Sequence, residues 1–273
     1  MTIVEQALAE DIGEGDITTT LCVSLSQTST AKIIAREPMV LAGLETLHEI
    51  FSSPSFFSPS VVGHALACPH KSGDHIEKDQ IIATIEAPTR LLLTRERTAL
   101  NFLQRLSGIA TLTHRYVQAI SHTPCKILDT RKTTPGLRLL EKAATRAGGA
   151  TNHRMGLYDA VLIKNNHITA AGGVRQALEK TRHTTLPVEI EVRTKQELDE
   201  ALHHGAKHLL LDNLTTAEAK AWITHIDNRA TVELSGNITL DTVAAYAETG
   251  ANYISVGVIT HAARAVDINF RIL

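Results

Sequence analysis

The sequence has few cysteines, and none of them stands in a metal-binding or redox pair. Cys22, Cys68 and Cys125 lie far apart in a chain of 273 residues, and no C-x-x-C motif is present. An odd number of isolated cysteines argues against a disulfide framework and is typical of proteins in a reducing compartment. We therefore expect small, mostly buried thiols and a cytoplasmic location.

The chain also lacks long apolar runs, a targeting segment and an excess of either charge. No stretch approaches the roughly 20 apolar residues needed to cross a bilayer. Residues 1–16 contain acids but no basic and then apolar run, so they do not resemble a signal peptide. The formal net charge of −2 predicts no general affinity for nucleic acids or membranes.

Two kinds of catalytic motif are missing as well. No G-x-G-x-x-G or G-x-x-x-x-G-K-[ST] sequence follows a predicted strand, so the common nucleotide-binding sheets are not indicated. The sequence shows no Ser/His/Asp or Cys/His arrangement for nucleophilic catalysis. A reaction carried out by this chain is therefore expected to depend mainly on positioning and charge.

Positive side chains gather in one stretch, residues 129–167. Two short apolar segments that read as strands, at 126–128 and 160–163, run directly into cations. The positive or titratable side chains here are Arg131, Lys132, His153, Arg154 and Lys164. Most charge runs form a solvated surface. Cations that follow apolar strands instead favour a site for a small, multiply anionic ligand.

Repeated strand–helix units predict the architecture of the C-terminal part. From residue 126 onward six apolar strands alternate with helix-length segments, which indicates a parallel sheet covered by helices, either doubly wound or an incomplete barrel. Residues up to about 93 lack this rhythm and predict an α+β domain. Expected elements before residue 126 are helices at 3–10, 43–51 and from Thr94 to about Ile120 with an interruption at Gly108, an extended segment at 15–22, and strands that include 30–37, 61–68, 81–85 and 89–93.

Polar residues end the later strands, where the loops of a barrel form its active face. Glu191 and Asp212 could hold ribose hydroxyls or a Mg²⁺ ion with its waters; an ion pair with a lysine of the adjacent strand is the alternative for each. Turns with glycine let backbone N–H groups approach a phosphate. The turns at the last two strands contain Ser235, Gly236, Asn237 and Gly257, although ordinary βα turns would look the same.

Five blocks of sequence resemble the quinolinate phosphoribosyltransferase family: DTRKTTPGLRLLEK, GGATNHRMGL, LIKNNHI, ERTALNFLQRLSGIAT and EDIGEGDITT. The resemblance covers essentially the whole chain. It implies an α/β fold, with an N-terminal α/β sandwich over 1–106, on which the tail 266–273 packs, joined to an open, incomplete α/β barrel over 107–265. It also implies a homodimer with shared active sites, larger assemblies occurring in some members.

The resemblance further implies an activity: quinolinate and phosphoribosyl pyrophosphate give nicotinate mononucleotide, pyrophosphate and CO₂ with Mg²⁺, a step of NAD biosynthesis. Arg131, His153, Arg154 and Lys164 would bind the two carboxylates, and Arg97, which the pattern alone reads as a solvated helix arginine, would come from the partner subunit. Lys132 would contact the pyrophosphate. Glu191 and Asp212 would serve the ribose and the metal, and catalysis would rest on these two acids, Lys132 and Lys164. Ser235, Gly236, Asn237, Gly257 and His261 would surround the 5′-phosphate.

The sequence departs from the family pattern at three positions. Asn165 replaces a common aspartate, Ala143 a tyrosine and Ala150 a glycine. Alanine at these two positions resembles a sibling family linked to molybdenum transport. That family usually lacks the residues present here as Arg97 and Lys164, which favour the quinolinate enzymes. Two rival hypotheses are a Schiff-base enzyme that uses Lys132 or Lys164 and a carrier-like module that presents Lys71 or Lys78.

Overall fold

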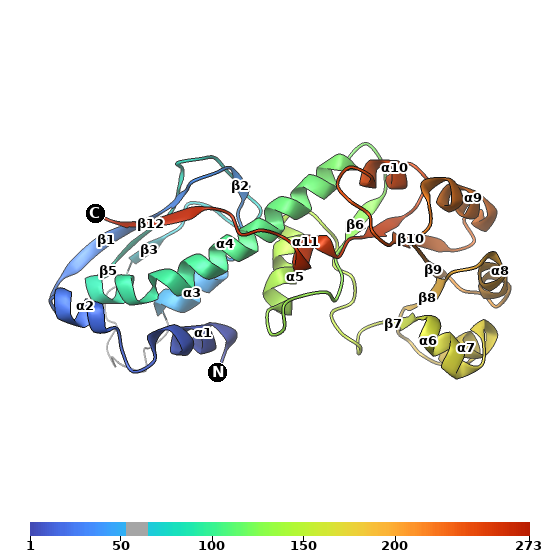
Figure 1. The fold of residues 1–273 in the computed structure, drawn as a ribbon, viewed down its shortest axis with the longest axis horizontal. Helices are drawn as coiled ribbons and strands as arrows, with labels where there is room; N and C mark the ends of the chain where they lie inside the picture. The colour runs from blue at the N-terminus through green and yellow to red at the C-terminus, as the bar shows by residue number, and fades with distance from the viewer. Residues whose placement is uncertain (53–64) are drawn as a thin grey trace. The chain divides into compact units, whose positions relative to one another are not determined.

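The chain folds into two compact units. The computed structural model describes residues 1–52 and 65–273. Unit 1 comprises Met1–His114, Thr134–Gly149 and Ala262–Leu273, and unit 2 comprises Arg115–Thr133 and Ala150–His261 (Figure 1). This division differs from a single boundary at 106/107, because residues on both sides of that point share one apolar core.

Unit 1 is built on an antiparallel sheet with helices packed against it. The sheet has the order β12-β1-β5-β3, and β2 pairs with β4 in a separate antiparallel pair. Its strands are β1 Thr28–Ala35, β2 Met39–Val40, β3 Ala65–Ala67, β4 His75–Ile76, β5 Ile81–Pro88 and β12 Ile268–Ile272. The helices that contribute to it are α1 Ile3–Ile12, α2 Ile17–Cys22, α3 Leu44–Ser52, α5 Arg138–Ala147 and most of α4 Thr89–Ala119. A core of buried side chains from β1, β5, α3 and α4 joins sheet and helices.

Three local predictions for unit 1 were wrong. Residues 17–22, expected to be extended, form α2, because the Asp16 side chain accepts the backbone N–H of Thr19 (2.9 Å) and caps the helix. Residues 89–93, expected to be a strand, are the first turns of α4. The expected strand over 61–68 is described only from Ala65 onward, where β3 begins; residues 61–64 lie outside the described residues.

After residues 17–22 and 89–93, the third wrong prediction is the helix interruption at Gly108. This residue lies inside α4, and the helix continues through it. A Cβ at this position would lie 2.0 Å from the carbonyl oxygen of Arg264. Gly108 therefore allows the C-terminal segment to pass directly against the helix, and this contact outweighs the roughly 1 kcal/mol that glycine costs inside a helix.

Helix α5 packs in unit 1, although it connects two strands of unit 2. Its Glu141 is fully buried and pairs with Arg105 of α4 at 2.9 Å. Ala144 of α5 shares a second apolar cluster with Ile109 and Ala110 of α4. These contacts explain why residues 107–114 and 134–149 group with the N-terminal residues.

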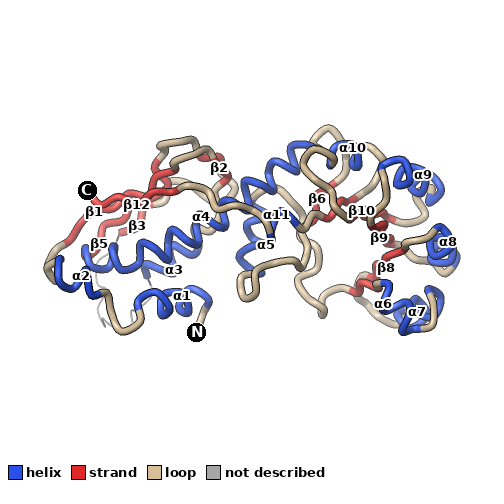
Figure 2. Tube along the Cα trace, in the orientation of Figure 1, coloured by secondary structure: helices blue, strands red, loops and turns tan. Residues whose placement is uncertain are grey.

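Unit 2 contains a six-stranded, all-parallel sheet in the order β6-β11-β10-β9-β8-β7. The strands are β6 Lys126–Leu128, β7 Val161–Ile163, β8 Val188–Val192, β9 His208–Asp212, β10 Thr231–Ser235 and β11 Tyr253–Ser255. The helices are α6 Asn165–Ala171, α7 Val174–Thr181, α8 Lys195–His203, α9 Thr216–Ile226, α10 Val243–Ala247 and α11 Val258–His261. Figure 2 shows the strands on the inner side of an arc and helices α6 to α10 along its outer side.

The sheet is an open barrel, because β6 and β7 are its two edge strands. All six strands predicted from the sequence are present at the expected positions, and the predicted fold class is confirmed. Because the strands are parallel, their carboxyl ends lie along one edge, where the loops that follow them meet.

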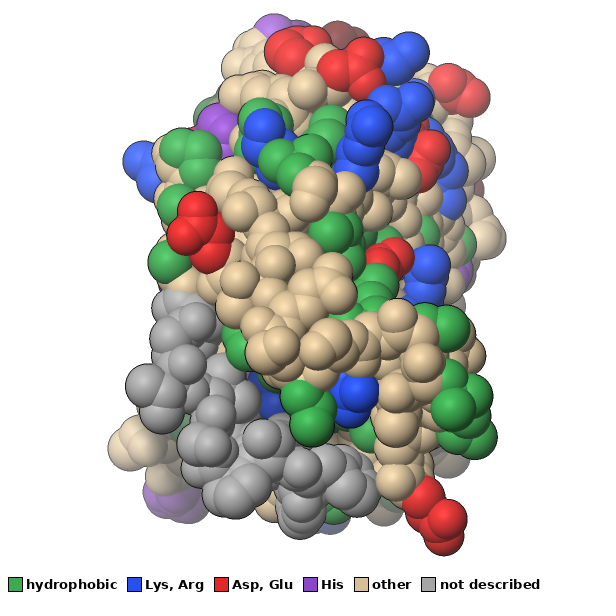
Figure 3. Space-filling model, turned by 90° about the vertical axis from the view of Figure 1, so that its left-hand side faces the viewer, with side chains coloured by type: hydrophobic (Ala, Val, Ile, Leu, Met, Phe, Trp, Pro, Cys, Tyr) green, Lys and Arg blue, Asp and Glu red, His purple; other side chains and the backbone are tan. Residues whose placement is uncertain are grey.

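On the face shown in Figure 3, hydrophobic side chains form small groups separated by polar and charged ones. Among the helices in the described part of the chain, none has the length and apolar character needed to span a membrane.

Candidate active site

A cavity of about 860 Å³ opens at the carboxyl ends of the strands of unit 2. Most of its lining residues end or follow β6, β7, β9, β10 and β11, and Leu162, Leu210 and Glu233 contribute from within strands. Eleven of the residues predicted from the sequence contribute to its wall: Arg131, Lys132, His153, Arg154, Lys164, Asp212, Ser235, Gly236, Asn237, Gly257 and His261. The strand order therefore brings together residues that are up to 130 positions apart in the chain.

Asp129 positions the loop that carries two of the cationic residues. This residue follows β6 and is fully buried. Its Oδ1 accepts the backbone N–H of His153 (2.8 Å), and its Oδ2 accepts the side-chain amide of Asn152 (2.5 Å). The carboxylate thereby fixes the loop before β7 beside the end of β6.

Arg154 lies close to Arg131 in the wall. Its guanidinium donates to the carbonyl oxygen of Ala160 (3.2 Å). Burial and the neighbouring charge of Arg131 lower the pKa of Arg154. Two guanidinium groups held in proximity are favourable only where anions offset their repulsion, and they suit a ligand with carboxylates, which arginine binds through paired hydrogen bonds.

Lys132 lies against the turn after β11. Its backbone carbonyl accepts the hydroxyl of Thr260 (2.7 Å), and a Cβ on Gly257 would lie 2.9 Å from the Lys132 Cδ. The lysine side chain therefore passes over a glycine of the neighbouring loop, and this contact joins the cationic residues after β6 to the turn at β11.

Lys164 and Glu191 form an ion pair between adjacent strands. Lys164 Nζ lies 3.2 Å from Glu191 Oε2; the lysine side chain is half-exposed and the glutamate is buried. Lys164 lines the cavity, whereas Glu191 is not part of its wall. The ion pair that the sequence left open as the alternative for Glu191 is thus present.

Asp212, at the end of β9, is held from both sides. Its carboxylate accepts the hydroxyl of Ser235 and the side-chain amide of Asn213, the latter at 2.6 Å. Gly236 has a φ of 98°, and a Cβ there would lie 2.7 Å from the backbone nitrogen of Asn213. Only glycine fits this turn, so the close approach of the loops after β9 and β10 depends on it.

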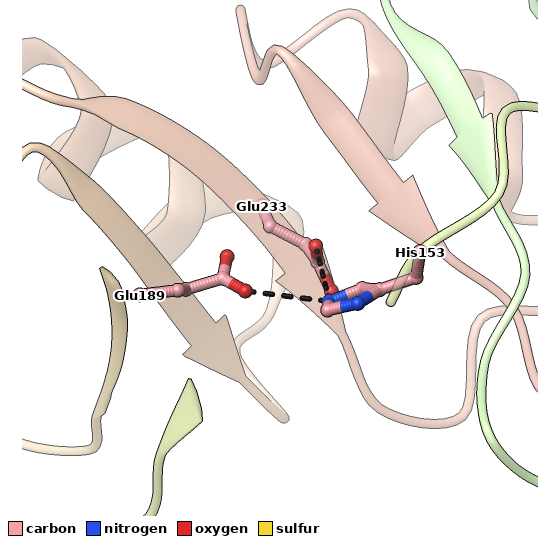
Figure 4. A group of neighbouring side chains, drawn as sticks. All are labelled: His153, Glu189 and Glu233. Atoms are coloured by element: carbon pink, nitrogen blue, oxygen red, sulfur yellow. Dashed lines mark ion pairs between the residues drawn. The ribbon is translucent and has the colours of Figure 1, made fainter. Parts of the chain in front are cut away.

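Two acids that the sequence reasoning missed, the partly buried Glu189 and the buried Glu233, hold His153 (Figure 4). His153 Nε2 lies 3.3 Å from Glu189 Oε2 of β8 and 3.4 Å from Glu233 Oε2 of β10. Burial lowers the pKa of His153, but the hydrogen bonds and charges of the two carboxylates outweigh it and raise that pKa to about 9. The sequence could have pointed to these two acids, because a carboxylate is unusual within a strand of a parallel sheet, where both faces are normally apolar.

Arg97 does not belong to this group of residues. It lies exposed on the part of α4 that belongs to unit 1. The loop with Lys71 and the turn with Lys78 flank β4 in the same unit.

Comparisons with known proteins give a consistent result for the whole chain. The family model described as the C-terminal domain of quinolinate phosphoribosyl transferase matches residues 109–271, and that of the N-terminal domain matches residues 16–107. A probable nicotinate-nucleotide pyrophosphorylase [carboxylating] of Bacillus subtilis is 40% identical over 263 residues, which cover 95% of this chain and 89% of the relative. The Mycobacterium leprae protein named nicotinate-nucleotide pyrophosphorylase [carboxylating] is also 40% identical, over 97% of this chain and 94% of its own length.

Solved structures show the same relationship. The nicotinate-nucleotide pyrophosphorylase from Francisella tularensis superposes with a TM-score of 0.93 at 37% identity, covering 99% of this chain and 95% of that one.

Proposed function

This chain belongs to the quinolinate phosphoribosyltransferase family, and we propose that it converts quinolinate and phosphoribosyl pyrophosphate to nicotinate mononucleotide, pyrophosphate and CO₂ in NAD biosynthesis. The observation that carries the proposal is the cavity of unit 2, whose wall presents both a group of cations and two glycine turns. A dicarboxylate and a phosphorylated sugar require these two features in one site.

Quinolinate is assigned to the cationic wall. Arg131, His153, Arg154 and Lys164 supply positive charge and N–H donors for its two carboxylates. Charge-assisted hydrogen bonds of this kind contribute about 1.5–3 kcal/mol each. Arg154 is held in place by Ala160, so part of the ordering cost is met before the substrate arrives.

Phosphoribosyl pyrophosphate is assigned to the two glycine turns of the cavity. Ser235, Gly236 and Asn237 after β10, with Gly257 and His261 after β11, surround the proposed site of the 5′-phosphate. Glycine at 236 lets that turn pack against Asn213 of the loop after β9, and backbone N–H groups of such glycine turns can donate to a phosphate. Lys132, which lies over Gly257, is the residue placed to contact the departing pyrophosphate.

Mg²⁺ fits the acid residues of this site as a proposed cofactor. Asp212 lines the cavity with a carboxylate whose neighbours are Ser235 and Asn213. Mg²⁺ is usually held by one or two carboxylates together with substrate phosphates and waters, so Asp212 is the direct ligand in our proposal and Glu191 acts from behind Lys164. The ion supplies charge neutralisation for pyrophosphate.

The chemistry follows from this placement. Departure of pyrophosphate leaves positive charge on the ribose, and Lys132 stabilises the negative charge that develops on the leaving group. The pyridine nitrogen attacks the ribose carbon, which gives a cationic ring. The ring cation stabilises the carbanion left at C2 when the 2-carboxylate departs as CO₂, and a proton from water then adds to C2 to give nicotinate mononucleotide. No side-chain nucleophile is required, and the protein contributes position and charge.

We further propose a cytoplasmic homodimer in which Arg97 completes the partner's site. Arg97 is exposed on α4. In the same unit the apolar side chains of Ile17, Leu21 and Leu25 are also exposed, and such exposed apolar side chains support a contact with another chain. Cys22, Cys68 and Cys125 are free thiols, in keeping with a reducing compartment. Lys164 forms an ion pair with Glu191, which argues against the Schiff-base alternative.

The decisive experiment uses quinolinate labelled in its 2-carboxylate. Purified protein with phosphoribosyl pyrophosphate and Mg²⁺ should release labelled CO₂ and form nicotinate mononucleotide in equal amounts. Reactions without phosphoribosyl pyrophosphate, and reactions with an Arg131→Gln variant, are the controls and should release almost none. A folded wild-type protein that releases no label would refute the proposal.

A further inference from the structure

The cluster of His153, Glu189 and Glu233 has a feature that substrate binding does not explain. The His153 and Glu189 side chains are 15% and 16% exposed, and that of Glu233 is 5% exposed. Two carboxylates therefore face one imidazole nitrogen away from bulk water. Burial raises the pKa of Glu189, and buried carboxylates without a positive partner are costly, so this arrangement favours a positive charge between the two acids.

The register of the sheet explains how the acids reach the histidine. Side chains two residues apart lie on one face of a strand, so Glu189 lies on the same face as Glu191, and Glu233 on the same face as Ser235. Glu191 and Ser235 belong to the strand ends, and the two acids lie one step deeper in the sheet. Glu233 still reaches the wall of the cavity, whereas Glu189 lies behind it.

The hydrogen bonds define the state of the ring. His153 Nδ1 accepts the backbone N–H of Arg154 (2.7 Å), so the proton that faces the two carboxylates is on Nε2. A second proton, added at Nδ1, releases the Arg154 N–H and converts Nδ1 into a donor. The charged groups around the ring are Glu189 of β8, Glu233 of β10, Asp129 after β6 and the neighbouring Arg154. Negative charges predominate on the Nε2 side.

We propose that Glu189 and Glu233 are positioning residues that fix the His153 ring through Nε2 and stabilise the positive charge with which the ring binds a substrate carboxylate. This inference rests on the proposed function for the identity of that carboxylate. An unperturbed histidine has a pKa of about 6.5 and is mostly neutral in the cell. The acid pair keeps the ring charged where quinolinate must be bound.

A metal ion is the competing use of the same three side chains. Their ligand atoms lie within 4.8 Å of one another. A metal on Nε2 would displace the proton that the two carboxylates share, whereas the distances of 3.3 and 3.4 Å suit hydrogen-bonded ion pairs. The structure therefore favours a protonated Nε2 held between two carboxylates over a metal site.

The test is a ¹⁵N NMR titration of the histidines in wild type, Glu189→Gln, Glu233→Gln and the double variant. The His153 signal is identified by its loss in His153→Gln. In the wild type Nε2 should stay protonated and Nδ1 should titrate near pH 9. Each single variant should lower that pKa by about 1–3 units, and the double variant should bring it to about 6.5 or below. Asp199→Asn, which removes the acid beside His225, is the matched control and should leave His153 unchanged.

Quinolinate binding gives a second readout. At about pH 8 the double variant should bind quinolinate roughly tenfold or more weakly than wild type, and this difference should narrow as the pH falls and the ring of the variant becomes charged as well. An unchanged His153 pKa in both single variants would overturn the inference. Stoichiometric Zn²⁺ binding to wild type that is lost in these variants would also overturn it, in favour of a metal site. If wild type bound no quinolinate at all, the proposed function would fail, while the titration would still decide the role of the acid pair.

Discussion

Replacement of Gly236 by alanine tests the turn assigned to the 5′-phosphate. The residue has a φ of 98°, and an added Cβ would lie 2.3 Å from Asn213 Oδ1 and 2.7 Å from its backbone nitrogen. A left-handed conformation costs a residue with a Cβ about 1–2 kcal/mol, and insertion into a packed place costs about 1–3 kcal/mol more. We expect the free energy of unfolding to fall by about 2–5 kcal/mol.

Gly205→Ala is a matched control for this variant. Gly205 has a similar φ of 81°, but an added Cβ would meet nothing within 4 Å. The free energy of unfolding of Gly205→Ala should fall only by the cost of the left-handed backbone conformation, about 1–2 kcal/mol. Its kcat/KM should equal that of the wild type. Displacement of the turn in Gly236→Ala should lower kcat/KM for phosphoribosyl pyrophosphate by as much as about 10²-fold. Urea unfolding and steady-state kinetics measure both effects. Equal losses of unfolding free energy in Gly236→Ala and Gly205→Ala, with unchanged kcat/KM in both, would refute the role of the close approach between Gly236 and Asn213.

Three further predictions concern separate parts of the chain. Burial raises the pKa of Cys125 to about 11, so iodoacetamide should modify it far more slowly than the exposed Cys22, with the rate rising up to that pH; equal rates near neutral pH would contradict this. Gly108→Ala should destabilise the protein by about 1–3 kcal/mol or more in urea unfolding, because the new Cβ would lie 2.0 Å from a backbone oxygen; a neutral effect would contradict it. Arg97→Ala and Arg131→Ala should each be inactive, and mixing them should restore one site in each hybrid dimer; no recovery after demonstrated subunit exchange would count against a shared site.

The sequence predicted the parallel sheet well because each strand is a compact apolar run between helix-length segments. Leu209, Leu211, Val232 and Leu234 are buried as that pattern required. It also located most of the residues around the cavity, since the carboxyl ends of parallel strands must meet.

Local patterns failed where a single contact decided the outcome. The threonine-rich segment before Cys22 has strand-like composition, yet the Asp16 cap starts a helix there. Gly108 would break a helix by propensity, but the passage of the C-terminal segment determines its identity. Glu189 and Glu233 escaped notice because their partner, His153, comes from a distant loop.

The pairing of β12 with β1 has a consequence for synthesis of the protein. Ile272 lies opposite Ala31, and Ile268 opposite Ala35, so a strand near the N-terminus pairs with one that the ribosome makes after every strand of the parallel sheet. At roughly 5–20 residues per second, β1 keeps an unpaired edge for many seconds. Such an edge can pair with other chains. Nascent molecules thus remain prone to aggregation through this edge until residues 268–272 emerge, and deletion of these residues would make the exposure permanent.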